Sequence, residues 1–262
     1  MKRILTILLL TVVIITACSK EPSTLTIKNG ILMVGMNIGY PPMEYMADDE
    51  ITPAGFDVIL GRAIAEKMGL EVQFVNTAWD KIFTAVDAKN FDCIISAVTI
   101  TPERQESYNF SKPYIKNALV VIMPKNSRHI ITSPLGLSGL GIAYKRATTS
   151  EQYMRQLRNE GLRFSSYEYE SVINCFDELR AGRIDALMTD LLVAYEYLGN
   201  TDDYKIVWQG GEEVFSICLK KGNDVLTSAI DEALDELIND GTLLRLSKET
   251  FNGLDMISGA RQ

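Results

Sequence analysis

The chemistry missing from the sequence excludes several classes of function. The 262 residues include one histidine, His129, in a polar stretch, and nothing places it near a nucleophile, so no Ser/His/Asp or Cys/His set is indicated. The four cysteines contain no CxxC pair, and neither GxGxxG nor GxxxxGK[ST] occurs. The chain has 34 acidic and 26 basic residues and no basic stretch, which argues against nucleic acid as a partner. We therefore expect no catalytic residue, no metal and no cofactor.

Long hydrophobic runs are also scarce, and the one at the N-terminus is too short to span a bilayer comfortably. Lys2 and Arg3 precede an apolar run over 4–15, the pattern of a secretory signal. The following ITAC, ending at Cys18, resembles the lipobox of bacterial lipoproteins. The resemblance implies a signal peptide at 1–17, acyl chains (palmitate among them) on Cys18, and a lipidated tether over 18–28. The alternative is an ordinary signal peptide with a chance cysteine, which the polar Ser/Lys/Glu/Pro stretch after Cys18 makes less attractive.

The other three cysteines, Cys93, Cys175 and Cys218, are odd in number, so they cannot all pair. Cys93 lies in an apolar run typical of a strand, and Cys175 lies in a helical pattern. We expect small buried thiols.

A strand-to-helix junction at 96–104 is the first candidate site. The apolar run at 91–95 predicts a buried strand, and Thr101 followed by Pro102 predicts a helix start. Free backbone groups, the Thr99 hydroxyl and the Arg104 guanidinium would meet there, and arginine fits a carboxylate bidentately. The alternative is an ordinary turn with a solvated arginine.

A weak internal repeat suggests two lobes of similar plan. Residues 88–97 and 181–190 both read as a helix end, a short turn, an apolar residue followed by Asp, and a buried strand. In this alignment Asp190 stands where Ala97 stands in the first copy. A buried acid needs a partner, which a ligand cation could supply, although Asp190 could also cap a helix starting at Leu191.

Three further stretches offer candidate wall residues. After a predicted strand at 31–35, the proline pair at 41–42 predicts an extended loop with Asn37 and Tyr40 beside it. Trp79 begins a predicted helix over 79–88, where it is equally a core residue. The turn at 145–151 predicts a helix N-terminus with Thr149 and Ser150, which suits an anion.

Five motifs in order resemble one family: G-(x)4-YPPMEY at 35–45, GFD at 55–57, TITPER at 99–104, FSKPY at 110–114 and GRIDA at 182–186. The chain from Ile31 to Phe251 is similar to the polar amino acid-binding proteins of ABC transporters, the family 3 solute-binding proteins. This implies an α/β, two-lobed periplasmic-binding-protein fold of type II. Lobe 1 would comprise 29–115 and 217–255, and lobe 2 would comprise 119–212. Two hinge strands would cross near 115–118 and 213–216.

The resemblance also implies roles for the candidate residues. Arg104 would clamp the ligand α-carboxylate, helped by Thr99 and by the helix N-terminus at Thr149 and Ser150. Asp190 and the carbonyl of Ala97 would take the α-ammonium, and Tyr40 and Trp79 would sandwich the side chain. Asn37 replaces an Asp of several relatives, which disfavours a basic ligand and leans towards a neutral polar one such as glutamine.

The function expected from this resemblance is binding without chemistry. A monomeric lipoprotein, held outside the cytoplasm on a bacterial membrane, would capture an amino acid between its lobes and deliver it to an ABC transporter permease. One alternative is an enzyme on the same fold, such as a cyclohexadienyl dehydratase or peptidoglycan lyase, which needs a carboxylate as general acid. The other alternative is a ligand-sensing receptor module.

Overall fold

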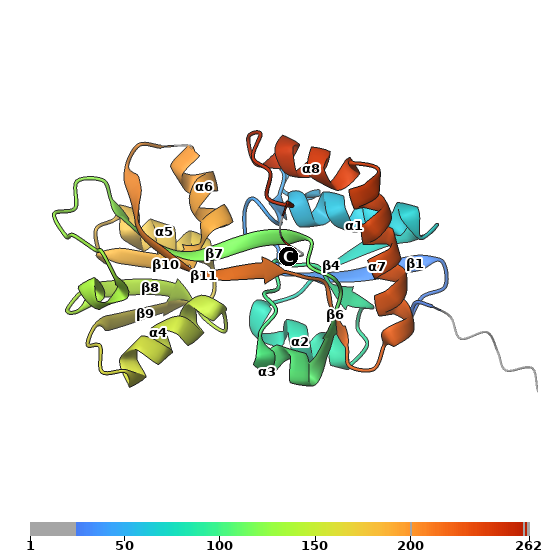
Figure 1. Ribbon diagram of the computed structural model, residues 1–262, viewed down its shortest axis with the longest axis horizontal. Helices are drawn as coiled ribbons and strands as arrows, with labels where there is room; N and C mark the ends of the chain where they lie inside the picture. Colours follow the sequence, from blue (N-terminus) through green and yellow to red (C-terminus); the bar gives the residue numbers. More distant parts are fainter. Residues whose placement is uncertain (1–24, 200, 259, 261–262) are drawn as a thin grey trace, which may run out of the picture.

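The computed structural model describes residues 25–199, 201–258 and 260 (Figure 1). The predicted signal peptide, Cys18 and the predicted tether up to residue 24 lie outside these ranges. Leu25–Lys28, the end of the predicted tether, lie against the protein: Thr26 is buried, and the amide of Ile27 donates to the Asp92 carboxylate at 2.6 Å. Within the described ranges, no helix combines the length and apolarity needed to cross a membrane.

Two five-stranded sheets form the frame of the molecule (Figure 1). The first sheet contains, in spatial order, β4 (Glu71–Asn76), β1 (Ile31–Met36), β5 (Cys93–Ile94), β12 (Cys218–Lys220) and β6 (Tyr108–Phe110). The second contains β11 (Tyr204–Phe215), β7 (Ile115–Pro124), β10 (Ala186–Asp190), β8 (Gly141–Lys145) and β9 (Ser165–Tyr169). A small hairpin of β2 (Tyr45–Met46) and β3 (Pro53–Ala54) lies beside the first sheet.

The two sheets, each with its helices, form two lobes that β7 and β11 connect (Figure 1). These two strands pair antiparallel along their length, and Phe215 at the end of β11 bridges Thr99 of the first lobe. The predicted crossings coincide with the start of β7 and the end of β11. The exact lobe boundaries stay a prediction.

Helices cover both faces of each sheet, as alternating strand and helix patterns require. The first lobe has α1 (Phe56–Lys67), α7 (Asp224–Asn239) and α8 (Thr242–Thr250) on one side, with α2 (Trp79–Asp87) and α3 (Pro102–Ser107) on the other. The second lobe has α5 (Val172–Arg180) and α6 (Leu191–Gly199) opposite α4 (Thr149–Asn159). The spacing of Phe56, Leu60, Ile64 and Met68 is that of one helix face, and the first three side chains are fully buried while Met68, just after α1, is half-buried.

Two strand predictions are wrong in extent. The apolar run at 215–219 reads as one strand but belongs to two: β11 ends at Phe215 in the second sheet, and β12 begins at Cys218 in the first. The run cannot reveal this change of partner, because all five of its residues are buried. The predicted strand at 91–95 forms ladder pairs only at Cys93 and Ile94. The three predicted buried thiols are confirmed, and none is paired.

The internal repeat is real in three dimensions. Asp92 exchanges two hydrogen bonds with the backbone of Met33, one through its amide (2.9 Å) and one through its carboxylate (2.8 Å). Asp185 makes the same two bonds with Gly141, at 2.8 and 2.7 Å. Each Asp thus holds the backbone of a neighbouring parallel strand, β1 in the first lobe and β8 in the second. The preceding turns also match, since Lys89 and Gly182 both have positive φ, 60° and 68°.

Candidate ligand site between the lobes

The carboxyl ends of four strands, β1 and β5 in the first lobe and β8 and β10 in the second, meet at one cavity between the lobes. It is lined by Tyr40, Glu44, Trp79, Ser96, Ala97, Thr99, Arg104, Lys145, Thr148, Thr149 and Asp190. Side chains fill it so closely that about 20 Å³ remains free. This is the position in which open α/β sheets bind ligands.

Seven of the nine predicted site residues line this cavity, and two do not. Ser150 is buried in the first turn of α4 without reaching the cavity. Asn37 lies just outside it, where its side-chain amide donates to the carbonyl of Thr77 at 3.2 Å. Its Oδ1 accepts a hydrogen bond from the Lys145 ammonium at 2.7 Å. Asn37 therefore acts on the site through Lys145.

Arg104 is held by its own turn and by the opposite lobe. Thr101 caps α3 by accepting from the Arg104 amide at 3.2 Å, as predicted. The guanidinium donates to the carbonyl of Thr99 at 2.9 Å and to that of Ala147 at 3.5 Å. It also lies 5.0 Å from the centre of the Phe83 ring, a cation–π contact. The arginine is thus positioned at the cavity and is not a solvated surface group.

Asp190 is a buried acid with side-chain partners from two other elements. Its oxygens accept hydrogen bonds from the Tyr40 hydroxyl and, at 2.7 Å, from the Asn117 side chain. Burial raises the pKa of Asp190, and these bonds together with the charges of Lys145 and Arg104 oppose that rise. These bonds orient Asp190 toward the cavity rather than along α6. The Tyr40–Asp190 bond also joins the two lobes.

The loop after β1 is a closed turn, not the extended loop predicted. The amides of Gly39 and Tyr40 both donate to the Glu44 carbonyl, at 3.0 and 2.7 Å. The turn brings the Glu44 side chain back into the cavity, where it accepts from the Ser96 hydroxyl at 2.7 Å. Burial, reinforced by the charge of Asp57, raises the pKa of Glu44 well above its ordinary value. No sequence pattern pointed to Glu44, because its position depends on the turn.

The space between Tyr40 and Trp79 holds the side chain of Lys145. Its ammonium lies 4.6 Å from the centre of the Tyr40 ring and 5.1 Å from that of Trp79. Trp79 also donates from Nε1 to the Ala147 carbonyl at 2.9 Å, while its ring packs in the first-lobe core. Both sequence interpretations of Trp79, core residue and wall residue, therefore describe it. Lys145 was missed, because it ends a buried strand and has no motif of its own.

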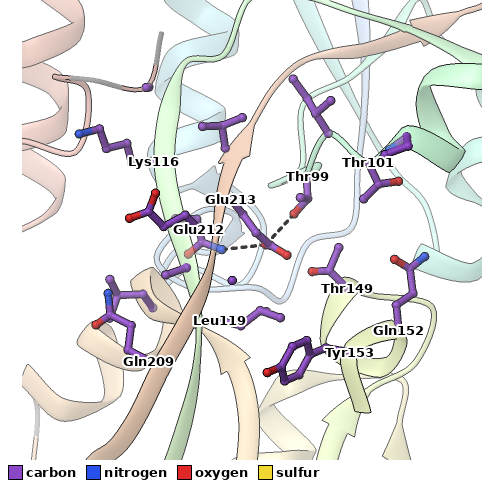
Figure 2. A pocket seen from close by; sticks show the side chains of 18 of the residues that line it. Thr99, Thr101, Lys116, Leu119, Thr149, Gln152, Tyr153, Gln209, Glu212 and Glu213 are labelled. Atoms are coloured by element: carbon purple, nitrogen blue, oxygen red, sulfur yellow. Dashed lines mark hydrogen bonds between the residues drawn. The ribbon is translucent and has the colours of Figure 1, made fainter. Parts of the chain in front are cut away.

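A second, larger cavity of about 870 Å³ lies beside β7 and β11, and Thr99 and Thr149 line both cavities (Figure 2). Figure 2 shows Glu213 facing Thr99 and Thr149 across it. Glu213 accepts from the Thr99 hydroxyl at 3.0 Å and from Asn117 at 3.2 Å. Burial, followed by repulsion from Asp190, raises the pKa of Glu213 to about 7. Asp190 is the one carboxylate that the sequence pattern places in a cleft, and the structure corrects this by adding Glu213 and Glu44.

The site offers no metal centre among the residues described: no group of three His, Cys, Asp or Glu side chains is arranged to hold an ion. The cavity between the lobes is lined by two cationic side chains, Arg104 and Lys145, and by the carboxyl groups of Glu44 and Asp190. Glu213 lines the adjoining larger cavity, together with Lys116 and Glu212. Such a set can hold a small molecule that carries charges of both signs.

Comparisons with known proteins agree with this architecture. The L-cystine-binding protein TcyJ of Escherichia coli (strain K12) is 32% identical over 230 residues, covering 86% of this chain and 84% of that protein. The arginine-, lysine-, histidine-binding protein ArtJ of Geobacillus stearothermophilus superposes with a TM-score of 0.80 at 30% identity, covering 88% and 99% of the two chains. The ancestral amino acid-binding protein AncCDT-1, a precursor of cyclohexadienyl dehydratase, superposes with a TM-score of 0.79 at 30% sequence identity, covering 85% of this chain and 96% of that chain. The expected two-lobed type II fold is confirmed.

The family model for bacterial extracellular solute-binding proteins, family 3, matches residues 32–253, which extend from β1 to the end of the described helices. Two of the five motifs that suggested this family, those at 35–45 and 99–104, contribute residues that line the cavity between the lobes. The chain belongs to the bacterial extracellular solute-binding proteins, family 3.

Proposed function

We propose that this protein is an extracytoplasmic substrate-binding lipoprotein that captures an amino acid between its lobes and delivers it to an ABC transporter permease. The observation that carries the proposal is that Arg104 from the first lobe and Asp190 from the second line the same cavity. An α-amino acid presents a carboxylate and an ammonium group on one carbon. Opposite charges from two lobes match that zwitterion, and TcyJ and ArtJ are named for binding amino acids.

In the proposed complex, Arg104 binds the α-carboxylate together with Thr99 and the helix N-terminus at Thr149. Asp190 and the Ala97 carbonyl bind the α-ammonium. Because these groups belong to two lobes, the ligand makes all its contacts only when the lobes are together, so binding shifts the population toward closure. The permease would then recognise the closed form.

Attachment to the membrane belongs to the same proposal. Acyl chains on Cys18 would hold the monomeric protein on the extracytoplasmic side of a bacterial membrane. Two lipid chains would give stable anchoring, whereas one chain would give reversible binding. Mass spectrometry of the purified protein tests this step: a chain beginning with acylated Cys18 supports it. An unmodified Cys18 in an intact or differently cleaved chain contradicts it.

The binding proposal is tested by thermal unfolding of the purified protein with each of the twenty amino acids, ornithine and cystine. A ligand that binds only the folded state raises the melting temperature as its concentration exceeds its dissociation constant. We expect a clear shift with one or a few of these compounds. A flat response, repeated after unfolding and dialysis to remove any trapped ligand, would contradict the proposal.

Arg104→Gln should weaken amino acid binding by about 10- to 100-fold, because the bound carboxylate would lose its charge-assisted hydrogen bonds. Titration calorimetry measures the loss. Arg245→Gln, which removes an exposed arginine of α8, is the matched control and should bind as the parent does. Equal affinity of Arg104→Gln and the parent would show that Arg104 does not clamp the carboxylate.

Glu213 is the observation that favours a second candidate, an enzyme of the dehydratase type. A cleft carboxyl with a pKa of about 7 has the protonation behaviour of a general acid. The assay is incubation with arogenate or prephenate, with Glu213→Gln as the control. We expect no turnover, and turnover that depends on Glu213 would place the enzyme ahead of the binding protein.

A further inference from the structure

Lys145 places a cation where the ligand side chain is expected. Its side chain is 6% exposed, and its ammonium lies over the faces of both Tyr40 and Trp79. The two rings come from the first lobe, whereas Lys145 is the last residue of β8 in the second. A ligand side chain entering between the rings must therefore meet this ammonium.

Asn37 fixes where the ammonium points. The Asn37 side chain donates from Nδ2 to the Thr77 carbonyl at 3.2 Å, which turns its Oδ1 toward Lys145. The resulting hydrogen bond of 2.7 Å, together with the two ring faces, holds the lysine at the inner end of the cavity. A flexible four-carbon stem lets the same ammonium retract as a ligand enters, which is necessary because about 20 Å³ is free.

The charges around the cavity leave Lys145 without a full counter-charge once an amino acid binds. In the proposed complex, the ligand carboxylate pairs with Arg104 and the ligand ammonium pairs with Asp190. Burial raises the pKa of Glu44 and lowers the pKa of Lys145 to about 8, so burial disfavours the charged form of both groups, and their mutual attraction opposes this. A buried, unpaired cation is costly. A second carboxylate on the ligand removes that cost, whereas a cationic side chain adds repulsion at close range.

We propose that Lys145 makes this site selective for amino acids that carry a second carboxylate and excludes those with cationic side chains. The inference rests on the proposed amino acid-binding function and names its ligand class. The second carboxylate could be the short side-chain group of aspartate or glutamate, or the distal group of cystine. The ammonium of Lys145 binds it, and Asn37 positions the ammonium.

The test compares three purified proteins by titration calorimetry: the parent, Lys145→Gln and Lys145→Arg. Arg146→Gln is the matched control, because it removes a positive charge one residue away from a half-exposed side chain that pairs with Glu170. Each protein is titrated with glutamate, aspartate, cystine, glutamine and arginine. Glutamine and glutamate differ mainly in charge, so the ratio of the affinities for these two ligands isolates the effect of the second carboxylate.

We expect the parent to prefer one of the dicarboxylic ligands over glutamine and arginine. Lys145→Gln should bind that ligand about 10- to 100-fold more weakly than the parent does. Its affinity for glutamine should change little, and it should bind arginine more tightly than the parent does. Lys145→Arg should retain most of the preference, and Arg146→Gln should match the parent.

Two results would overturn the proposal while leaving the general function in place, and a third would remove both. A parent that binds glutamine or arginine more tightly than every dicarboxylic ligand refutes the selectivity while leaving amino acid binding in place. Undiminished dicarboxylate binding by Lys145→Gln refutes the role of the lysine. Binding of no amino acid by the parent removes the proposed function itself. The parent panel needs no variant, so it decides the selectivity even if Lys145→Gln does not fold.

Discussion

Among single side chains, Glu213 is one whose ionisation we expect to be visible in the stability of the protein. Its pKa rises from 4.5 to about 7, so the folded state holds a proton that the unfolded state has released between these values. Stability from this group therefore falls as the pH rises from 4.5 to 7 and stays lowest above 7.

Glu213→Gln should remove this loss, because the amide is neutral at every pH and keeps an oxygen to accept from Thr99 and Asn117. We expect the variant to melt a few degrees above the parent at pH 8, and this difference in melting temperature should shrink toward pH 4.5. Melting curves across this range measure it. Glu212→Gln, on the exposed neighbouring residue, is the control. A gap that stays constant with pH would contradict the assignment.

At the scale of the elements, the repeated Asp holds a neighbouring parallel strand in each lobe, β1 or β8. Asp92 and Asp185 hold equivalent backbone groups of β1 and β8, yet their surroundings differ. Asp92 is 4% exposed and also accepts from the Ile27 amide, whereas Asp185 is exposed to solvent. Water can replace the Asp185 carboxylate but has little access to the groups around Asp92.

Asp92→Ala should therefore destabilise the protein by about 1–3 kcal/mol, because it leaves the amides of Ile27 and Met33 unpaired next to a buried position. Asp185→Ala should cost less, about 0.5–1 kcal/mol. Chemical denaturation of the two variants gives the comparison, with each serving as the control for the other. Equal losses would show that the burial of Asp92 does not decide the cost.

For the whole molecule, the hydrogen bonds between the lobes set how readily they stay together. Trp79 Nε1 donates across the cavity to the Ala147 carbonyl, and the Tyr40 hydroxyl likewise donates from the first lobe to Asp190 in the second. Bonds of this kind contribute about 0.5–1.5 kcal/mol each. The lobes should therefore exchange between open and closed forms, with the ligand favouring the closed one.

Trp79→Phe keeps an aromatic face but loses the bond to Ala147. We expect amino acid affinity to fall by about 2- to 10-fold and the radius of gyration to increase, with little change in stability. Calorimetry and small-angle scattering measure these effects. Trp208→Phe is the matched control, since Trp208 packs on Tyr153 within the second lobe. An unchanged affinity for Trp79→Phe would mean that this bond does not govern closure.

The sequence alone determined the family, the type of fold and most of the cavity lining. These are local properties: Thr101 and Pro102 start a helix wherever they follow a strand, and the repeated turn with its Asp folds similarly in both lobes. Arg104, Asp190, Tyr40 and Trp79 reach the cavity because each lies at a strand end or a helix start. Periodicity and capping identify such positions without knowledge of the partner elements.

Only the tertiary structure decided which side chains meet between the lobes. Glu44 enters the cavity through a closed turn, Glu213 through the crossing of β11, and Lys145 by lying between two rings of the opposite lobe. Inside the cavities, Glu44 meets Ser96 and Glu213 meets Thr99, which lie 52 and 114 positions away along the chain, so no local pattern records these contacts. The charge at the inner end of the site, and with it the proposed ligand class, follows from packing between lobes that sequence periodicity cannot describe.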